Sequence, residues 1–257
     1  MIEAFGLTKQ YAGGEGVSDL TFFIAPGELF VFLGPNGAGK STTIKMLTGL
    51  LAPTSGMARV ASKDVARETL SLKRLIGYMA ERPYLYEKLT GREFLHFVAD
   101  VEGDQQLPRP AVAHAARELL VAFELEGAAD SLIETYSQGM RQKIALSGVL
   151  IHEPAVLFLD EPTNGLDPRS ARLVKDVLRH ICDRGATVFM TTHVLEIAEQ
   201  MCDRVGILRD GRLIALGSLA DLRRAQEMPG ASLESIFLRL TGSADVSELG
   251  LYAGVAG

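Results

Sequence analysis

The chain has 257 residues, a formal net charge of −6 and 47% hydrophobic residues. That length suits one large domain or two small ones, and the composition predicts a packed core rather than a disordered chain. No apolar run approaches the ~20 residues of a membrane-spanning helix, and no secretory signal is expected from the first residues. Because no long Lys/Arg block appears, no nucleic-acid partner is expected.

The first third of the chain is predicted to form short strands. Partly alternating apolar segments at residues 2–7, 17–24 and 28–33 are separated by Gly13-Gly14 and Pro26-Gly27, which favour turns. A helix is expected over residues 40–47, ended by Gly49, because a glycine commonly stops a helix. Two more strands are expected at residues 56–60 and 75–79.

The middle of the chain has a helical pattern, and the last part alternates between helix and strand. Apolar residues recur at helical spacing over residues 91–150, with the third helix at 137–150. The continuous apolar run at 156–159 is typical of a strand buried in a parallel sheet. Helices at 168–184 and 194–202 then alternate with strands at 187–191 and 204–208, which favours a mostly parallel sheet covered by helices.

The end of the chain and the two cysteines give two further expectations. An amphipathic helix is expected at 233–240, and the Gly/Ala-rich residues after it are expected to be mobile. Cys182 and Cys202 lie inside helix-like segments without metal-ligand spacing, so we expect buried, reduced thiols in a cytosolic protein.

The segment GPNGAGKST, residues 34–42, follows an apolar run and precedes a predicted helix. Gly34, Gly39, Lys40 and Ser41 match the pattern G-x-x-x-x-G-K-[ST], in the strand–loop–helix setting that supports it over an ordinary glycine-rich turn. Glycines let backbone N–H groups surround phosphate oxygens, and a helix start attracts anions. Lys40 suits the β- and γ-phosphates, and the hydroxyl of Ser41 suits Mg²⁺. The residues expected to bind the nucleotide here are Gly34, Pro35, Asn36, Gly37, Ala38, Gly39, Lys40, Ser41 and Thr42.

A second segment, AVLFLDEPTNGLDP at residues 155–168, supplies two adjacent carboxylates. Asp160 ends a predicted buried strand, so a merely solvated acidic turn is disfavoured. Mg²⁺ prefers oxygen ligands, and Asp160 is expected to hold it directly or through water. Glu161 is then placed to polarise an attacking water.

With these motifs the chain resembles the ATP-binding-cassette ATPases over residues 2–224. Further motifs follow in the family's order: a signature-like YSQGMRQK at 136–143, an Asn-Gly-Leu-Asp segment at 164–167 and Thr-Thr-His at 191–193. The first of these, with IGYMAE at 76–81 and a Leu-Glu-x-Ile-Phe-like tail at 233–237, is similar to the ATPase subunits of ABC-2-type export systems.

The resemblance implies a fold, an activity and partners. The fold is an α/β P-loop NTPase: a RecA-like core with a mostly parallel sheet, antiparallel N-terminal strands and an inserted helical subdomain. The ATP-binding domain is expected at 1–225, with the subdomain at about 84–150 and a tail at 226–257. The implied activity is MgATP hydrolysis by a homodimer or heterodimer of cassettes, which powers a separate membrane-spanning permease subunit at the cytoplasmic face of the plasma membrane.

The resemblance also assigns roles outside the two motifs. Tyr11, after the first strand, is expected to stack on adenine, the alternative being an ordinary strand-end aromatic. His193 is expected to contact the γ-phosphate and to assist Glu161 in catalysis, together with Lys40. Ser137 can cap a helix, and with Gly139 it is expected to reach the ATP of the opposite subunit. Asp167 is included in the nucleotide-binding set.

Three residues depart from the family's pattern. Glu81 stands where glutamine is usual, and its oxygens are expected to approach Mg²⁺ and the nucleotide. Gln138 replaces a usual glycine and Met140 a usual glutamine in the signature-like segment, which weakens the expectation of a side-chain contact to the ribose. The following residues 82–89, with Pro-Tyr-Leu-Tyr, are expected to dock the membrane subunit, unless they form an ordinary loop on the helices.

Two rival functions are weighed against transport. A soluble cassette ATPase acting on DNA or ribosomes usually carries coiled-coil arms, tandem cassettes or basic extensions, which the sequence does not show. A regulator that binds ATP without cleaving it often lacks the carboxylate that Glu161 supplies. Both are therefore expected to be wrong.

Overall fold

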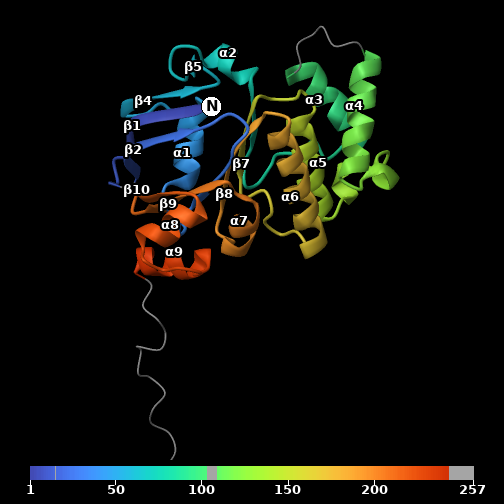
Figure 1. Ribbon diagram of the computed structural model, residues 1–257. Coiled ribbons are helices and arrows are strands. Elements are labelled where there is room, and N and C mark those ends of the chain that lie inside the picture. Colours follow the sequence, from blue (N-terminus) through green and yellow to red (C-terminus); the bar gives the residue numbers. More distant parts are fainter. Residues whose placement is uncertain (15, 103–108, 243–257) are drawn as a thin grey trace, which may run out of the picture.

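The computed structural model describes residues 1–14, 16–102 and 109–242, which form two sheets with helices packed around them (Figure 1). The Gly/Ala-rich end of the tail lies outside these residues. In the part of the chain that is described, no helix is long and apolar enough to cross a bilayer.

A six-stranded sheet forms the centre of the molecule, in the order β10-β9-β3-β8-β7-β6. Its strands are β3 (Leu29–Leu33), β6 (Ile76–Met79), β7 (Val156–Asp160), β8 (Thr187–Thr192), β9 (Arg204–Arg209) and β10 (Arg212–Gly217). All pairings are parallel except that of β10 with β9. Strands β3, β7 and β8 are buried along their whole length, as expected for apolar strands with helices or a second sheet on both faces.

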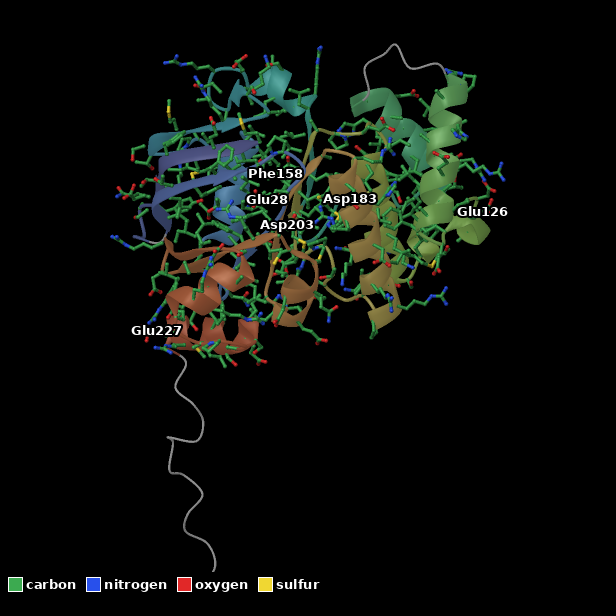
Figure 2. The ribbon with its side chains drawn as sticks, viewed as in Figure 1. Glu28, Glu126, Phe158, Asp183, Asp203 and Glu227 are labelled. Carbon is green, nitrogen blue, oxygen red and sulfur yellow. The ribbon has the colours of Figure 1, made fainter. Side chains whose placement is uncertain are left out.

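A four-stranded antiparallel sheet, in the order β2-β1-β4-β5, packs over one side of α1 (Lys40–Leu47). Its strands are β1 (Ile2–Gln10), β2 (Gly16–Ile24), β4 (Ser55–Val60) and β5 (Lys63–Asp64). The core between the two sheets is rich in phenylalanine; the rings of Phe32 and Phe189 lie 5.1 Å apart between centroids. Figure 2 shows the buried Phe158 in this interior.

Helices α3 (Gly91–Glu102), α4 (Arg109–Ala122), α5 (Gln138–Leu150) and α6 (Pro168–Asp183) gather on the side of the molecule opposite the antiparallel sheet (Figure 1). Two short 3₁₀ turns, Glu126–Ala128 and Ile133–Thr135, lie between α4 and α5. Helices α7 (Leu195–Met201), α8 (Leu219–Ala225) and α9 (Leu233–Thr241) pack together at one end. Leu233 and Ile236 of α9 are fully buried in the same core as β3 and β8.

The predicted α/β class with mostly parallel strands is confirmed, and most predicted elements lie within a few residues of their place. The structure adds β5, β10, α2 (Thr69–Lys73) and α8, which the sequence analysis did not predict. The hairpin of β9 and β10 turns at Asp210-Gly211, an Asp-Gly pair that favours tight turns. Helix α8 starts with a capping box between Ser218 and Asp221. Both signals were present in the sequence.

A polar cluster holds the start of β3, the strand that leads to the glycine-rich loop. Arg179 of α6 bonds Asp183 and Asp203, and Asp203 also accepts a 2.8 Å hydrogen bond from the backbone N–H of Leu29. Figure 2 labels both aspartates. The cluster ties α6, β3 and the turn before β9 together, so the base of the central sheet is fixed.

Candidate active site

The predicted site residues come together because four parallel strands end at one edge of the central sheet. The register pairs Leu33 with Thr192, Asp160 with Thr191, and Met79 with Leu159. The loop after β3, the carboxylates after β7, the histidine after β8 and the segment after β6 must therefore meet there. This is the edge where ligands bind in open α/β sheets.

A pocket of about 570 Å³ opens at this edge. Its lining contains most of the predicted residues, together with Gly16 and Asn164, which were not assigned a role. The lining residues are Tyr11, Gly16, Pro35, Asn36, Gly37, Ala38, Gly39, Lys40, Ser41, Thr42, Glu81, Asp160, Glu161, Asn164 and His193. Gly34, the first residue of the glycine-rich loop, is not in the lining.

The glycine-rich loop needs its glycines for conformation and for space. Gly39 has φ 101°, and a Cβ there would lie 2.2 Å from a methyl group of Val17. A Cβ on Gly34 would lie 2.7 Å from the carbonyl oxygen of Leu208. Gly39 caps α1 without any side-chain hydrogen bond, so the first N–H groups of that helix remain for an anion. This geometry fits the phosphate-binding loop that the motif predicts.

Lys40 is a buried cation at the start of α1. Its Nζ donates to the carbonyl of Gly34 at 2.7 Å and to that of Pro35 at 3.3 Å. Burial lowers the pKa of the Lys40 ammonium, and the nearby carboxylates of Glu161, Asp160 and Glu81 oppose this shift. Among the described residues its hydrogen-bond partners are these backbone carbonyls, and such a cation is suited to exchange them for phosphate oxygens.

The two carboxylates after β7 are buried and held differently. The hydroxyl of Thr191 donates to Asp160, and the backbone N–H of Glu161 donates to the carbonyl of Thr191 at 3.1 Å. Glu161 has φ 52°, a left-handed conformation that is uncommon for a residue with a side chain. Its Oε2 lies 3.0 Å from Nδ1 of His193. The structure therefore pairs Glu161 with His193, the histidine predicted to assist it.

The oxygen donors of this pocket fit a Mg²⁺ ion that is bound jointly by the protein and the nucleotide phosphates, and not by the protein alone. Among the described residues, no group of three or more His, Cys, Asp and Glu side chains could hold a metal ion. Mg²⁺ typically takes one or two carboxylates, several waters and substrate phosphates. The hydroxyl of Ser41 and the carboxylates of Asp160 and Glu81 line one pocket beside the phosphate loop, which suits that mode.

Besides Gly34, three predicted residues do not line this pocket. Ser137 caps α5, where its hydroxyl oxygen accepts from the N–H of Met140 at 3.3 Å. Gly139 follows in the first turn. Asp167 caps α6 by accepting from the N–H of Ser170 at 3.0 Å. None of these three residues is part of the lining of the pocket around the phosphate loop.

Gln142 is the contact that the sequence analysis missed. It lies on α5, is only 7% exposed, and its amide nitrogen donates to the carbonyl oxygen of Pro162 at 3.1 Å. The signature-like segment contained this residue, but no local pattern shows that its side chain reaches the carboxylate loop. Thr191 was named as part of the Thr-Thr-His segment, but the hydrogen bond from its hydroxyl to Asp160 was not predicted.

A second, more apolar pocket of about 490 Å³ lies beside β6. Its lining includes Tyr84, Tyr86, Phe97 and Val101, and Tyr84 is fully exposed. The rings of Tyr86 and Phe97 pack edge to face with 4.8 Å between centroids. Exposed aromatics around a hollow are typical of an interaction surface.

The fold and the pocket together define a P-loop nucleotide-binding ATPase domain. Comparison with known proteins gives the family: the model described as ABC transporter matches residues 17–164, more than half of the chain. The chain belongs to this family. It is an ATP-binding and ATP-hydrolysing subunit of an ABC transporter.

Curated relatives and solved structures agree with this assignment. The daunorubicin/doxorubicin resistance ATP-binding protein DrrA of Streptomyces peucetius is 41% identical over 93% of this chain and 69% of its own length. A fluoroquinolones export ATP-binding protein of Mycobacterium tuberculosis is 38% identical over 95% of this chain and 83% of its own length. The chain spans only 41% of YbhF, a probable multidrug ABC transporter ATP-binding protein of Escherichia coli, at 39% identity over 93% of this chain.

Among solved structures, an ATP-binding subunit of an ABC transporter has a TM-score of 0.86 at 34% identity, over 93% of this chain and 99% of that chain. A dimeric ATP-binding cassette in a post-hydrolysis state with ADP and Pi has a TM-score of 0.75 at 25% identity. That match covers 85% of this chain and 99% of the other.

Proposed function

We propose that this subunit powers export by dimerising around ATP and driving a separate membrane-spanning permease subunit. The names of relatives that confer drug resistance or export fluoroquinolones support an antibiotic or drug-like cargo. A cassette acting on nucleic acid or ribosomes is not favoured, since these relatives are transporter subunits. The proposed place of action is the cytoplasmic face of the plasma membrane.

The observation that carries the proposal is the pocket in which Lys40 and the phosphate loop face the Glu161–His193 pair. We assign the triphosphate to the loop and to Lys40, and the adenine to Tyr11, an exposed ring on the same pocket. Glu161 accepts the proton of the attacking water, and His193 orients the carboxylate. Mg²⁺, held by Ser41, Asp160 and Glu81 with the phosphates, would neutralise the charge that develops on them.

The proposed dimer is head-to-tail, with either an identical or a different cassette as the partner. The start of α5, with Ser137 and Gly139, would meet the ATP bound by the opposite subunit, and Asp167 would lie at the same interface. Support comes from their absence from the lining of the nucleotide pocket of their own chain and from the accessible helix start, where Ser137 is exposed. An ATP molecule held between two chains would couple nucleotide binding to closure of the dimer.

The membrane subunit is proposed to dock on the aromatic pocket beside β6. Glu81 lines the nucleotide pocket, and the segment that follows it, residues 82–89, contributes Tyr84 and Tyr86 to the docking pocket. A shift of this segment would therefore reach both sites. We propose the division expected from the sequence, with an ATP-binding domain at 1–225, an inserted helical subdomain at about 84–150 and a tail at 226–257. The docking pocket lies between this subdomain and β6.

Two variants test the assigned roles, because Lys40 and Glu161 should fail differently. Lys40→Ala should weaken nucleotide binding and abolish turnover. Glu161→Gln should keep MgATP binding, stop cleavage and trap a dimer that light scattering detects. Wild-type turnover by Glu161→Gln would show that another group acts as the base.

A further inference from the structure

Helix α5 is joined to the loop of the proposed catalytic base by one buried amide. The Gln142 side chain nitrogen donates to the carbonyl oxygens of Pro162 at 3.1 Å and of Glu161 at 3.5 Å. Gln142 lies five residues after Ser137, the cap of the same helix. The connection thus spans less than two helical turns, from the end proposed to meet the partner's ATP to the base in its own site.

The neighbouring side chains on α5 are directed elsewhere. Arg141 bonds the carboxylate of Glu87, and the ammonium of Lys143 lies 4.0 Å from a carboxylate oxygen of Glu124. Gln142 alone of these three consecutive residues has a bond to the loop after β7 among the contacts of the described chain. The start of α5 also packs on this loop, since the Gln138 side chain lies against Gly165. The hydrogen bonds of Gln142 differ from that packing because they reach the carbonyl groups of Glu161 and Pro162.

The loop needs support because Glu161 has an unfavourable backbone conformation. Its φ of 52° costs free energy unless surrounding contacts hold it. Strand β8 supplies one contact, since the N–H of Glu161 donates to the carbonyl of Thr191. On the carbonyl side, the backbone N–H of Asn164 donates to the carbonyl of Glu161 at 3.1 Å, and the Gln142 amide donates to the next carbonyl, that of Pro162, at 3.1 Å. The peptide that carries the base is thereby held from both sides.

We propose that Gln142 is a positioning residue for ATP hydrolysis, which couples the start of α5 to the carboxylate of Glu161. The inference rests on the proposed dimer, in which that start meets the partner's ATP. Movement of α5 on dimer closure is transmitted through the Gln142 amide to the backbone of Glu161. Among the described residues, the amide donates to the carbonyls of Glu161 and Pro162 and to no residue of the phosphate loop, so it affects cleavage rather than nucleotide binding.

The test compares two substitutions of similar volume. Gln142→Met removes the donor and keeps the length of the side chain. It should lower kcat about tenfold or more, whereas KM for MgATP changes less than about threefold, because a small misplacement of a catalytic group slows chemistry without altering binding. In the Glu161→Gln background it should still allow the ATP-bound dimer. Gln200→Met, an exposed glutamine on α7, is the matched control and should keep wild-type kinetics.

Gln142→Glu separates the hydrogen bond from packing. A carboxylate cannot donate to the two carbonyls, but its protonated form can donate one O–H, and burial favours that form. The ratio of Gln142→Glu to wild-type kcat should rise as the pH falls from about 8 to about 6, whereas the ratio for Gln142→Met should stay flat.

The failures are distinguishable. A wild-type chain without ATP-dependent dimerisation would overturn the proposed dimer. A wild-type chain that dimerises and turns over, beside a Gln142→Met variant of equal kcat, would overturn the role of Gln142 alone. Parallel pH ratios for the Met and Glu variants would reduce Gln142 to a packing residue and also contradict the inference.

Discussion

At the scale of single residues, charge balance distinguishes this site. One buried lysine lies in the field of three carboxylates, those of Glu161, Asp160 and Glu81. Glu81 is the member that departs from the family's usual glutamine. It is exposed and lines both the nucleotide pocket and the neighbouring pocket near Gln138. Its charge attracts a cation but repels the other two carboxylates, so its effect depends on whether a metal is bound.

We predict that Glu81→Gln keeps substantial ATPase activity and shifts the Mg²⁺ concentration needed for half-maximal rate by a few-fold. Removing the Glu81 charge weakens the attraction for Mg²⁺ and also relieves the repulsion of Asp160 and Glu161. Both effects change the dependence of the ATPase rate on Mg²⁺ concentration. Glu81→Ala should impair transport more than ATP binding. The measurement is ATPase rate against Mg²⁺, with and without the membrane subunit, and Glu118→Gln on α4 is the exposed control. Superimposed curves would place Glu81 outside the site.

The thiols give a prediction about reactivity. Burial raises the pKa of Cys182 to about 11 and that of Cys202 to about 12, so the reactive thiolate is scarce at neutral pH. A thiol reagent at pH 8 should therefore label the native protein slowly and the unfolded protein rapidly at both positions. The measurement is absorbance of the released product, before and after adding guanidinium. Prompt labelling of the native chain would contradict the raised pKa values that follow from the burial of Cys182 and the partial burial of Cys202.

At the scale of elements, the loop between β3 and α1 depends on a glycine that cannot be replaced. Gly39→Ala places a methyl group within 2.2 Å of Val17 and forces an alanine to φ 101°. We expect a loss of about 1–3 kcal/mol in the free energy of unfolding, together with weaker nucleotide binding. Urea unfolding and a binding titration measure the two effects.

Gly127→Ala is the matched control for this loop. A Cβ there meets nothing within 4 Å, and Gly127 is absent from the residues with positive φ. Its stability should stay within about 0.5 kcal/mol of the wild type. Equal stabilities of the two alanine variants would show that the loop adapts to a side chain.

At the scale of the whole molecule, the expectation is a peripheral subunit recruited by a membrane partner. The purified chain should be soluble and should co-fractionate with membranes only when a multi-span subunit is co-expressed. Tyr84→Ser, in the aromatic pocket, should weaken that association, whereas Leu70→Ser, an exposed residue of α2 outside the pocket, should not. Strong, salt-sensitive binding to DNA or RNA would instead support the rival class of cassette.

The sequence by itself determined the chemistry-bearing motifs and most of the elements. The phosphate loop at 34–42 and Asp160-Glu161 are local patterns, since their meaning depends on residues close together in the chain. Long apolar runs such as those of β3 and β7 were predicted for the same reason, because burial on both faces leaves a continuous signal. Short or marginal elements such as α2 and β5 leave little periodicity to detect.

Only the tertiary structure decided how the motifs meet. The position of β8 between β3 and β7 sets His193 against Glu161, and strand order depends on pairings far apart in the chain. The bond of Gln142 to Pro162 joins two elements, and the left-handed backbone of Glu161 is held by such contacts. These features depend on packing between distant segments, which no short pattern encodes. Local motifs specify which groups are available, and the register of the sheet determines which of them can act together.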